Sequence, residues 1–155
     1  MKRYILILAL AVTAFLPSCR DHEDIVFDDY YVCIKDETGV SSGIVSQTSN
    51  NFVTTYYVYM TAPKLDRDVI VTYELEVGDG LSEGVDFRVQ ETTRSPLVFT
   101  PGTTRLPIRF VWLKHELDPA RNNSVTIRLT SCSEGYLIGY PGPAHRFDAY
   151  TVTKQ

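Results

Sequence analysis

Three segments of the chain alternate strictly between apolar and polar residues, and this period-two pattern restricts the fold more than any other feature. A half-buried β-strand has this period because successive side chains point to opposite faces of the sheet. The regular runs cover residues 69–77, 106–112 and 125–129. Less regular runs cover residues 25–34, 52–60, 85–89, 97–99 and 147–153. Since turn-forming Gly, Pro and Asp residues separate the runs, the sequence predicts an all-β chain with about eight strands and little helix.

Length and composition indicate one folded domain. The chain has 155 residues, of which 44% are hydrophobic and 12% aromatic, and this aromatic content argues against intrinsic disorder and against a coiled coil. It contains no internal repeat and no low-complexity linker. Short strands at this spacing are typical of a β-sandwich. We therefore expect a single sandwich domain over residues 25–155, with no second, catalytic domain.

The N-terminal segment is typical of a bacterial export signal. Lys2 and Arg3 precede an apolar run over residues 4–16, which is too short for a membrane-spanning helix of about 20 residues. The run ends in the tetrapeptide LPSC, which resembles the bacterial lipobox. The resemblance implies a lipoprotein signal peptide over residues 1–18 and a mature N-terminus at Cys19 that carries lipid chains. A cleaved secretory signal or a buried N-terminal helix is the alternative.

Acidic residues follow the expected lipidation site. The segment RDHED at residues 20–24 resembles the surface-export signal of Bacteroidetes lipoproteins, and a simple solvated tether is the alternative; we treat residues 19–24 as an acylated tether. Without residues 1–18 the chain has 13 Lys and Arg against 19 Asp and Glu. Anionic lipid and nucleic acid both repel a protein with this balance. We expect a surface-exposed outer-membrane protein, attached by its lipid anchor alone and without a nucleic-acid partner.

Several motifs in the β-rich part resemble those of Calx-beta domains. They are GVDF at residues 84–87, LVFTPGTT at 97–104, LPIRF at 106–110 and VTIRL at 125–129. The segment YLIGYPGP at 136–143 is similar to an Ig-like domain of unknown function in Bacteroidetes surface lipoproteins, some of which continue into glycoside-hydrolase family 18-like or lectin-like domains. The resemblance implies an Ig-like, Calx-beta-type antiparallel β-sandwich of about seven or eight strands.

Two of these motifs have simple local explanations. We expect the carboxylate of Asp86 to accept hydrogen bonds from nearby backbone N–H groups and Phe87 to enter the core. Pro101 and Gly102 are suited to the two central positions of a type II turn, where the second residue needs a positive φ. These residues therefore indicate a fold and carry little information about function.

No metal or cofactor site is predicted. Calcium-binding Calx-beta domains use an acidic cluster just after the strand that corresponds to residues 108–112, and here residues 113–118 contain Lys114 and His115 instead of paired carboxylates. Oxygen-rich calcium coordination is poorly served by such a segment. His115 and His145 stand far apart and lack the ligand spacing of a zinc site.

Catalytic residues are also not indicated. The sequence lacks the Gly-x-Ser-x-Gly nucleophile elbow and any phosphate-binding glycine loop. Glu74 and Glu76 share one face of a predicted strand about 7 Å apart, a separation compatible with an inverting glycosidase, but alternating Glu residues are also usual on a solvent-facing strand. We expect no enzyme, and a glycosidase is the weakest of the functional hypotheses.

Tyr57 and Tyr59 are the candidate ligand-binding residues. If Tyr56 and Val58 face the core, Tyr57 and Tyr59 point outward side by side. Two coplanar exposed rings would stack on the C–H faces of a sugar. Tyr is also a favoured strand residue, so the alternative is that these rings cover the sheet or contact another subunit.

Cys33 and Cys132 remain once Cys19 is assigned to lipid. An oxidising compartment would allow a disulfide between them. Both stand in strand-like segments, where a cysteine also occurs as a small buried hydrophobic residue. The sequence leaves these two interpretations open.

The predicted function follows from the address and the family resemblance. We expect a non-catalytic outer-membrane lipoprotein that acts as a glycan-binding or accessory module in nutrient uptake or adhesion. The alternative is a structural subunit that packs on another outer-membrane protein. Its partners would be the membrane, through the anchor, and a polysaccharide or a second outer-membrane protein.

Overall fold

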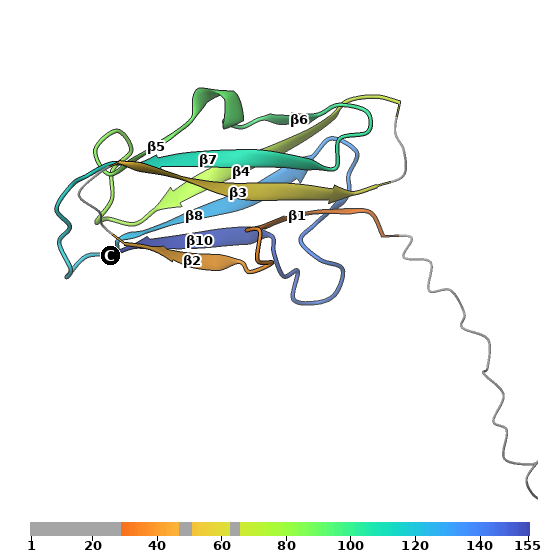
Figure 1. Ribbon diagram of the computed structural model, residues 1–155. Helices are drawn as coiled ribbons and strands as arrows, with labels where there is room; N and C mark the ends of the chain where they lie inside the picture. Colours follow the sequence, from red (N-terminus) through yellow and green to blue (C-terminus); the bar gives the residue numbers. More distant parts are fainter. Residues whose placement is uncertain (1–28, 47–50, 63–65) are drawn as a thin grey trace, which may run out of the picture.

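Two five-stranded sheets pack face to face and form a β-sandwich (Figure 1). The computed structural model describes residues 29–46, 51–62 and 66–155. The first sheet, sheet A, has the spatial order β5 (Phe87–Val89), β7 (Arg105–Trp112), β3 (Phe52–Thr61), β1 (Tyr31–Lys35) and β9 (Leu137–Ile138). The second, sheet B, has the order β2 (Ser42–Val45), β10 (Ala149–Lys154), β8 (Ser124–Cys132), β4 (Val69–Val77) and β6 (Leu97–Phe99).

The all-β prediction is confirmed. Each of the eight predicted runs contains a strand, and the described residues hold no α-helix, only the short 3-10 helix η1 (Glu91–Thr93). Residues 85 and 86 belong to a turn, since Asp86 N–H donates to Ser82 O at 2.9 Å, so β5 begins only at Phe87. No helix within the described residues is long and apolar enough to cross a membrane.

Two strands were not predicted, and both pair in parallel with a neighbour. β2 pairs with β10, and β9 pairs with β1, whereas the other strand pairs are antiparallel. β9 has two residues and β2 begins with Ser-Gly, so neither carries a period-two signal. Gly43 leaves room in β2 for the hydroxyl of Tyr150, which would have to shift because a Cβ there would lie 2.8 Å from it. These edge strands therefore depend on their neighbours and not on local sequence.

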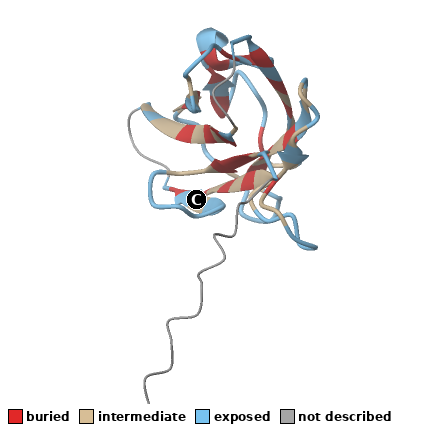
Figure 2. Ribbon diagram, turned by 90° about the vertical axis from the view of Figure 1, so that its right-hand side faces the viewer, coloured by how far each residue is buried: buried red, intermediate tan, exposed pale blue. Residues whose placement is uncertain are grey.

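Buried residues lie along the strands of both sheets (Figure 2), and the core that they form contains several aromatic side chains. Phe87, Phe110 and Trp112 are fully buried, and their rings contact one another with centroids 5.4–5.8 Å apart. The indole N–H of Trp112 donates to Thr54 Oγ1 at 2.8 Å, which satisfies the one polar atom that this ring buries. Because Phe87 and Trp112 come from different strands, this packing joins the β5–β7 edge to the core.

Both local predictions from the motifs are confirmed. Asp86 Oδ2 accepts a hydrogen bond from the backbone N–H of Ser82 at 2.9 Å, and Phe87 is 0% exposed. Gly102 has φ of 84°, and Thr103 N–H donates to Thr100 O at 2.9 Å, as a type II turn requires. The predicted signal peptide, the tether and Cys19 lie outside the described residues.

Candidate functional site

The outward face of sheet A carries tyrosines and basic residues on neighbouring strands. Tyr57 and Tyr59 on β3 point outward, because Tyr56, Val58 and Met60 between and beside them are buried. This confirms the predicted orientation of β3. We name the outward side of sheet A the tyrosine–cation face and define it by Tyr31, Lys35, Tyr57, Tyr59, Arg88, Arg105 and Arg109.

Strand register places a basic side chain on each side of the tyrosine pair. Arg105 on β7 is the cross-strand partner of Tyr59, and Lys35 on β1 is the partner of Tyr57. Each cation lies over the ring of the diagonal neighbour. Lys35 Nζ is 4.8 Å from the Tyr59 ring centroid, and the Arg105 guanidinium carbon is 4.5 Å from that of Tyr57. Cation–π attraction therefore fixes both charges beside the rings.

The sequence suggested two coplanar rings, and this expectation is wrong. Their centroids are 6.2 Å apart, and their planes meet at 55°. The rings tilt because each packs against a cation from a different neighbouring strand. A ligand on this face would meet two inclined rings with a positive charge beside each.

Sheet A is free of acidic residues, although the protein as a whole is acidic. None of its five strands contains an Asp or Glu. Within the described residues, no ion pair forms with Lys35, Arg88, Arg105 or Arg109. Lys35 Nζ donates to the Tyr140 hydroxyl at 3.1 Å, and this hydrogen bond raises the pKa of Lys35. The lysine is therefore held in its charged form.

A hollow of about 470 Å³ adjoins the tyrosine–cation face at Tyr57. Tyr57 and Thr55 form one wall, and Asp36, Glu37 and Thr38, which follow β1, form another. The carboxylate of Asp36 accepts hydrogen bonds from Thr38, Val40 and the Tyr150 hydroxyl. Burial opposes the ionisation of Asp36, but these hydrogen bonds outweigh it and lower its pKa. The hollow thus offers hydroxyl, carboxylate and aromatic groups around one opening.

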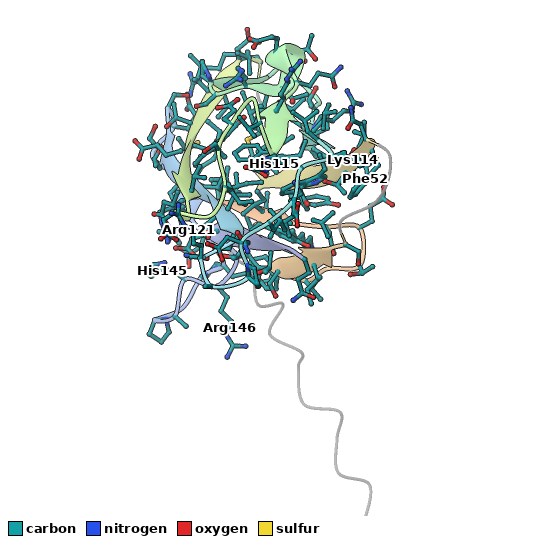
Figure 3. The ribbon with its side chains drawn as sticks, turned by 90° about the vertical axis from the view of Figure 1, so that its left-hand side faces the viewer. Phe52, Lys114, His115, Arg121, His145 and Arg146 are labelled. Atoms are coloured by element: carbon teal, nitrogen blue, oxygen red, sulfur yellow. The ribbon has the colours of Figure 1, made fainter. Side chains whose placement is uncertain are left out.

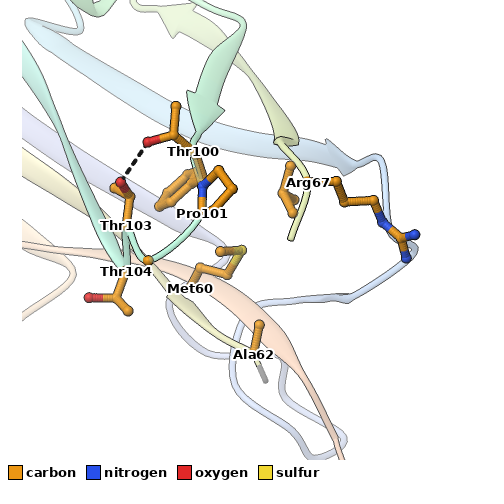
Figure 4. Close-up of a pocket in the computed structure, with 10 residues that line it drawn as sticks. Met60, Ala62, Arg67, Thr100, Pro101, Thr103 and Thr104 are labelled. Carbon is orange, nitrogen blue, oxygen red and sulfur yellow. Dashed lines mark hydrogen bonds between the residues drawn. The ribbon is translucent and has the colours of Figure 1, made fainter. Parts of the chain in front are cut away.

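A second hollow of about 240 Å³ lies beside the C-terminal end of β3 (Figure 4). Met60, Val69 and Phe99 form its floor, and the turn at Thr100–Thr103 forms its rim. Arg67 also borders it, but its guanidinium donates to Glu134 Oε2 at 2.9 Å. The charged group is therefore engaged elsewhere, and this hollow is less suited to a polar ligand than the first.

A buried charged cluster closes the end of the sandwich where residues 113–118 follow β7. Asp86 and Lys154 are each 2% exposed, and Lys154 Nζ lies 3.3 Å from Asp86 Oδ1. The ammonium also donates to Leu113 O at 2.9 Å, and His115 Nδ1 lies 2.9 Å from the same carboxylate oxygen. Burial opposes the ionisation of Asp86, but hydrogen bonds from Ser82, His115 and Lys154 outweigh it and lower its pKa.

The segment after β7 therefore surrounds a lysine and not a carboxylate cluster. Within the described residues, no group of three or more His, Cys, Asp or Glu converges on a common point. His145 lies in an exposed loop away from His115 (Figure 3). Because the Lys154 ammonium contacts Asp86 directly, this end of the sandwich serves the fold by joining β10 to the end of β7.

Glu74 and Glu76 are exposed on the outward side of β4, on the face of sheet B. Arg128 Nε and Nη2 donate to the two carboxylate oxygens of Glu76 at 2.5 and 3.1 Å. The hydrogen bonds from Arg128 lower the pKa of Glu76. A carboxylate held in this way is a poor proton donor, which argues against the general-acid half of a glycosidase pair at Glu76.

Cys33 and Cys132 are free thiols in the structure. Cys33 lies between Val32 and Ile34, which enter the core, so its side chain is on the outward side of sheet A. Cys132 on β8 packs against the core. Sheet A therefore separates the two thiols. Burial raises the pKa of Cys33 to about 11, which keeps it in the unreactive thiol form.

Comparison with known proteins finds solved structures with a similar fold. No family model matches the sequence, and no curated protein matches it. The chain is similar to the crystal structure of the apo-form Calx CBD1 domain, with a TM-score of 0.52 and 19% identity over 83% of this chain and 99% of that chain. It is also similar to the crystal structure of CBD12 from CALX1.2, with a TM-score of 0.51 and 22% identity over 81% of this chain.

The fold is Calx-beta-like. The chain covers 43% of the CBD12 structure, which is less than half its length. At this level of identity the likeness shows the fold alone. The Calx-beta-like fold agrees with the role of the motifs at 84–87 and 97–104, whose described residues form turns and core contacts.

Sequence reasoning found the tyrosines of the face but missed its basic residues. Lys35, Arg88, Arg105 and Arg109 come from three strands and are not clustered along the chain. The alternation of β7 placed Arg105 and Arg109 on the outward side in principle. Only the pairing of β3 with both β7 and β1 shows that these cations surround the tyrosines.

Proposed function

We propose that this protein is a non-catalytic lipoprotein of the outer membrane that binds glycans or serves as an accessory module, of the kind that Bacteroidetes use in nutrient uptake or adhesion. The supporting observation is the outward tyrosine pair, Tyr57 and Tyr59, beside the hollow that Tyr57 lines. Aromatic rings stack on the apolar faces of sugars, and their phenol groups hydrogen-bond to sugar hydroxyls. Thr38 and Thr55 also line the hollow and add polar residues beside the rings.

A polysaccharide panel tests this proposal. The full-length protein in detergent is applied to arrayed neutral and acidic polysaccharides, together with the variants Tyr57→Ala and Tyr59→Ala. We expect the wild-type protein to bind at least one polymer. Each variant should bind that polymer roughly tenfold more weakly, because the stacking of a sugar on a tyrosine ring contributes on the order of 1–2 kcal/mol.

Tyr30→Ala is the matched control for the panel. Tyr30 is 38% exposed, precedes β1 and contacts Tyr136, so it lies outside the tyrosine–cation face. Its replacement should leave binding unchanged. Failure of the wild-type protein to bind any polysaccharide would overturn the proposal.

The anchor is tested separately. We propose that Cys19 carries the lipid that holds the protein at the outer membrane. Metabolic labelling with a palmitate analogue should mark the wild-type protein, and Cys19→Ala should abolish the label. Labelling that persists in the variant would contradict the anchor without bearing on the glycan proposal.

An interaction subunit is the second candidate. Ile70 on β4 and Val98 on β6 are cross-strand partners, and each is 43% exposed on the outward side of sheet B. Ile44 on the edge strand β2 is 68% exposed. Crosslinking in intact cells tests this function, and recovery of the protein only as a monomer would count against it.

A further inference from the structure

The tyrosine–cation face is positively charged, whereas the chain as a whole is acidic. The chain has a formal net charge of −4, yet the strands of sheet A contain no acidic residue and four outward cations. Asp36 and Glu37 follow β1 and line the adjoining hollow, so the cations and not the hollow carry the positive charge of this face. Four of the eight arginines in the described residues, Arg67, Arg94, Arg121 and Arg128, have an acidic partner, and all four lie outside sheet A. The cations of sheet A lack such a partner among the described residues.

The four cations are distributed over the outward side of sheet A and do not form one compact cluster. Arg105 and Arg109 are four residues apart on β7, which is about 13 Å along a strand. Lys35 and Arg105 stand on either side of β3, about 10 Å apart across the sheet. Arg88 extends the basic area to β5, where its cross-strand partner is Val111. The spacing fits a ligand that carries acidic groups at several points along its length.

Contacts with tyrosines hold Lys35 and Arg105 in fixed positions before a ligand binds. Lys35 is fixed by the Tyr59 ring and by a hydrogen bond to Tyr140, and Arg105 is fixed over Tyr57. Since each cation has several N–H donors, donors remain for an incoming anion. Binding to a side chain that is already ordered costs less conformational entropy.

We infer that the tyrosine–cation face binds an acidic polysaccharide, one whose sugars carry carboxylate or sulfate groups. In this arrangement Lys35 and Arg105 form charge-assisted hydrogen bonds with the acidic groups while Tyr57 and Tyr59 contact the sugar rings. The inference rests on the proposed glycan-binding function and adds the class of glycan. The short cationic area on an acidic protein is less suited to nucleic acid, which presents a charge about every 1.7 Å.

A pair of matched polymers tests the inference. The full-length protein in detergent is titrated with polygalacturonate and with carboxyl-reduced polygalacturonate, which has the same linkages without the charges. Chondroitin sulfate serves as the sulfated probe. We expect at least one acidic polymer to bind roughly tenfold or more tightly than the neutral one, and we expect added salt to weaken this binding.

Two double variants locate the binding. Lys35→Gln with Arg105→Gln should weaken acidic-polymer binding by about tenfold or more. Lys114→Gln with Arg146→Gln removes the same charges elsewhere, since both residues are exposed and lie off sheet A (Figure 3). This control should bind as the wild-type protein does.

Three results would overturn the inference. Equal binding of the acidic and neutral polymers, lost in Tyr57→Ala, would leave glycan binding intact and remove the acidic class. Absence of binding to every polysaccharide would remove both proposals. Equally tight binding to duplex DNA or to phosphatidylglycerol vesicles, lost in Lys35→Gln with Arg105→Gln, would show a general anion-binding surface.

Discussion

Two groups of charged residues in this protein stand in opposite surroundings. Asp86 and Lys154 are buried at one end of the sandwich, and each contacts the other and further hydrogen-bond partners. Lys35 and Arg105 lie on the tyrosine–cation face, beside aromatic rings and without an ion pair among the described residues. A buried charge must be fully paired, whereas an outward cation remains able to bind. The first group therefore stabilises the fold, and the second is placed for the glycan binding that we propose.

The largest effect is expected from breaking the buried pair. Asp86→Ala leaves the Lys154 ammonium buried without its carboxylate, and we expect the free energy of unfolding to fall by about 3–5 kcal/mol. Urea denaturation measures this change. His115→Gln removes a partner whose side chain is 50% exposed, and it should cost less than about 1 kcal/mol. A similar small cost for Asp86→Ala would show that the buried cluster is not a folding element.

The same pair predicts a loss of stability in acid. The pKa of Asp86 is below its ordinary value of 3.8, so its ionised form stabilises the fold above that value, and this stability is lost as the pH falls through the folded pKa. We expect the urea midpoint of the wild-type protein to begin to fall below about pH 5 and to fall most steeply below the ordinary value of 3.8. Asp86→Asn should show a smaller fall over this range. Parallel curves for the two proteins would contradict the assignment.

A smaller effect on stability is expected on the tyrosine–cation face. Lys35→Gln with Arg105→Gln removes no ion pair but removes one exposed cation–π contact at each position, so the free energy of unfolding should fall by no more than about 1 kcal/mol for each substitution. Polysaccharide binding should nevertheless weaken, because the same two cations would contact the acidic groups of the polymer. A large drop in the melting temperature would show that these cations stabilise sheet A, and the contrast with the buried pair would then fail.

The smallest effect is expected from the exposed ion pair on sheet B. Glu76→Gln removes the hydrogen-bonded carboxylate that Arg128 contacts, but both side chains are exposed. Solvent screens such a pair, so the melting temperature should change little. Acidic-polymer binding should be unchanged, because Glu76 lies on the outward side of the other sheet. Weaker binding in this variant would place recognition on sheet B.

The regular strands of the fold were predictable because burial of one face imposes a period of two. β4, β7 and β8 follow this pattern closely, and so does the outward orientation of Tyr57 and Tyr59 on β3. β2 and β9 were missed because short edge strands are held by backbone pairing with β10 and β1. The tilt of the tyrosine rings was missed because it depends on cations from neighbouring strands.

The sequence by itself determined the all-β class, the inward and outward sides of the long strands, and the local turns at Asp86 and Gly102. Each of these follows from interactions between residues close together along the chain. Only the tertiary structure decided that Lys35, Arg88 and Arg105 share one face, and that Lys154 reaches Asp86. Those contacts join residues far apart in sequence, so they exist only once strand order and register are fixed.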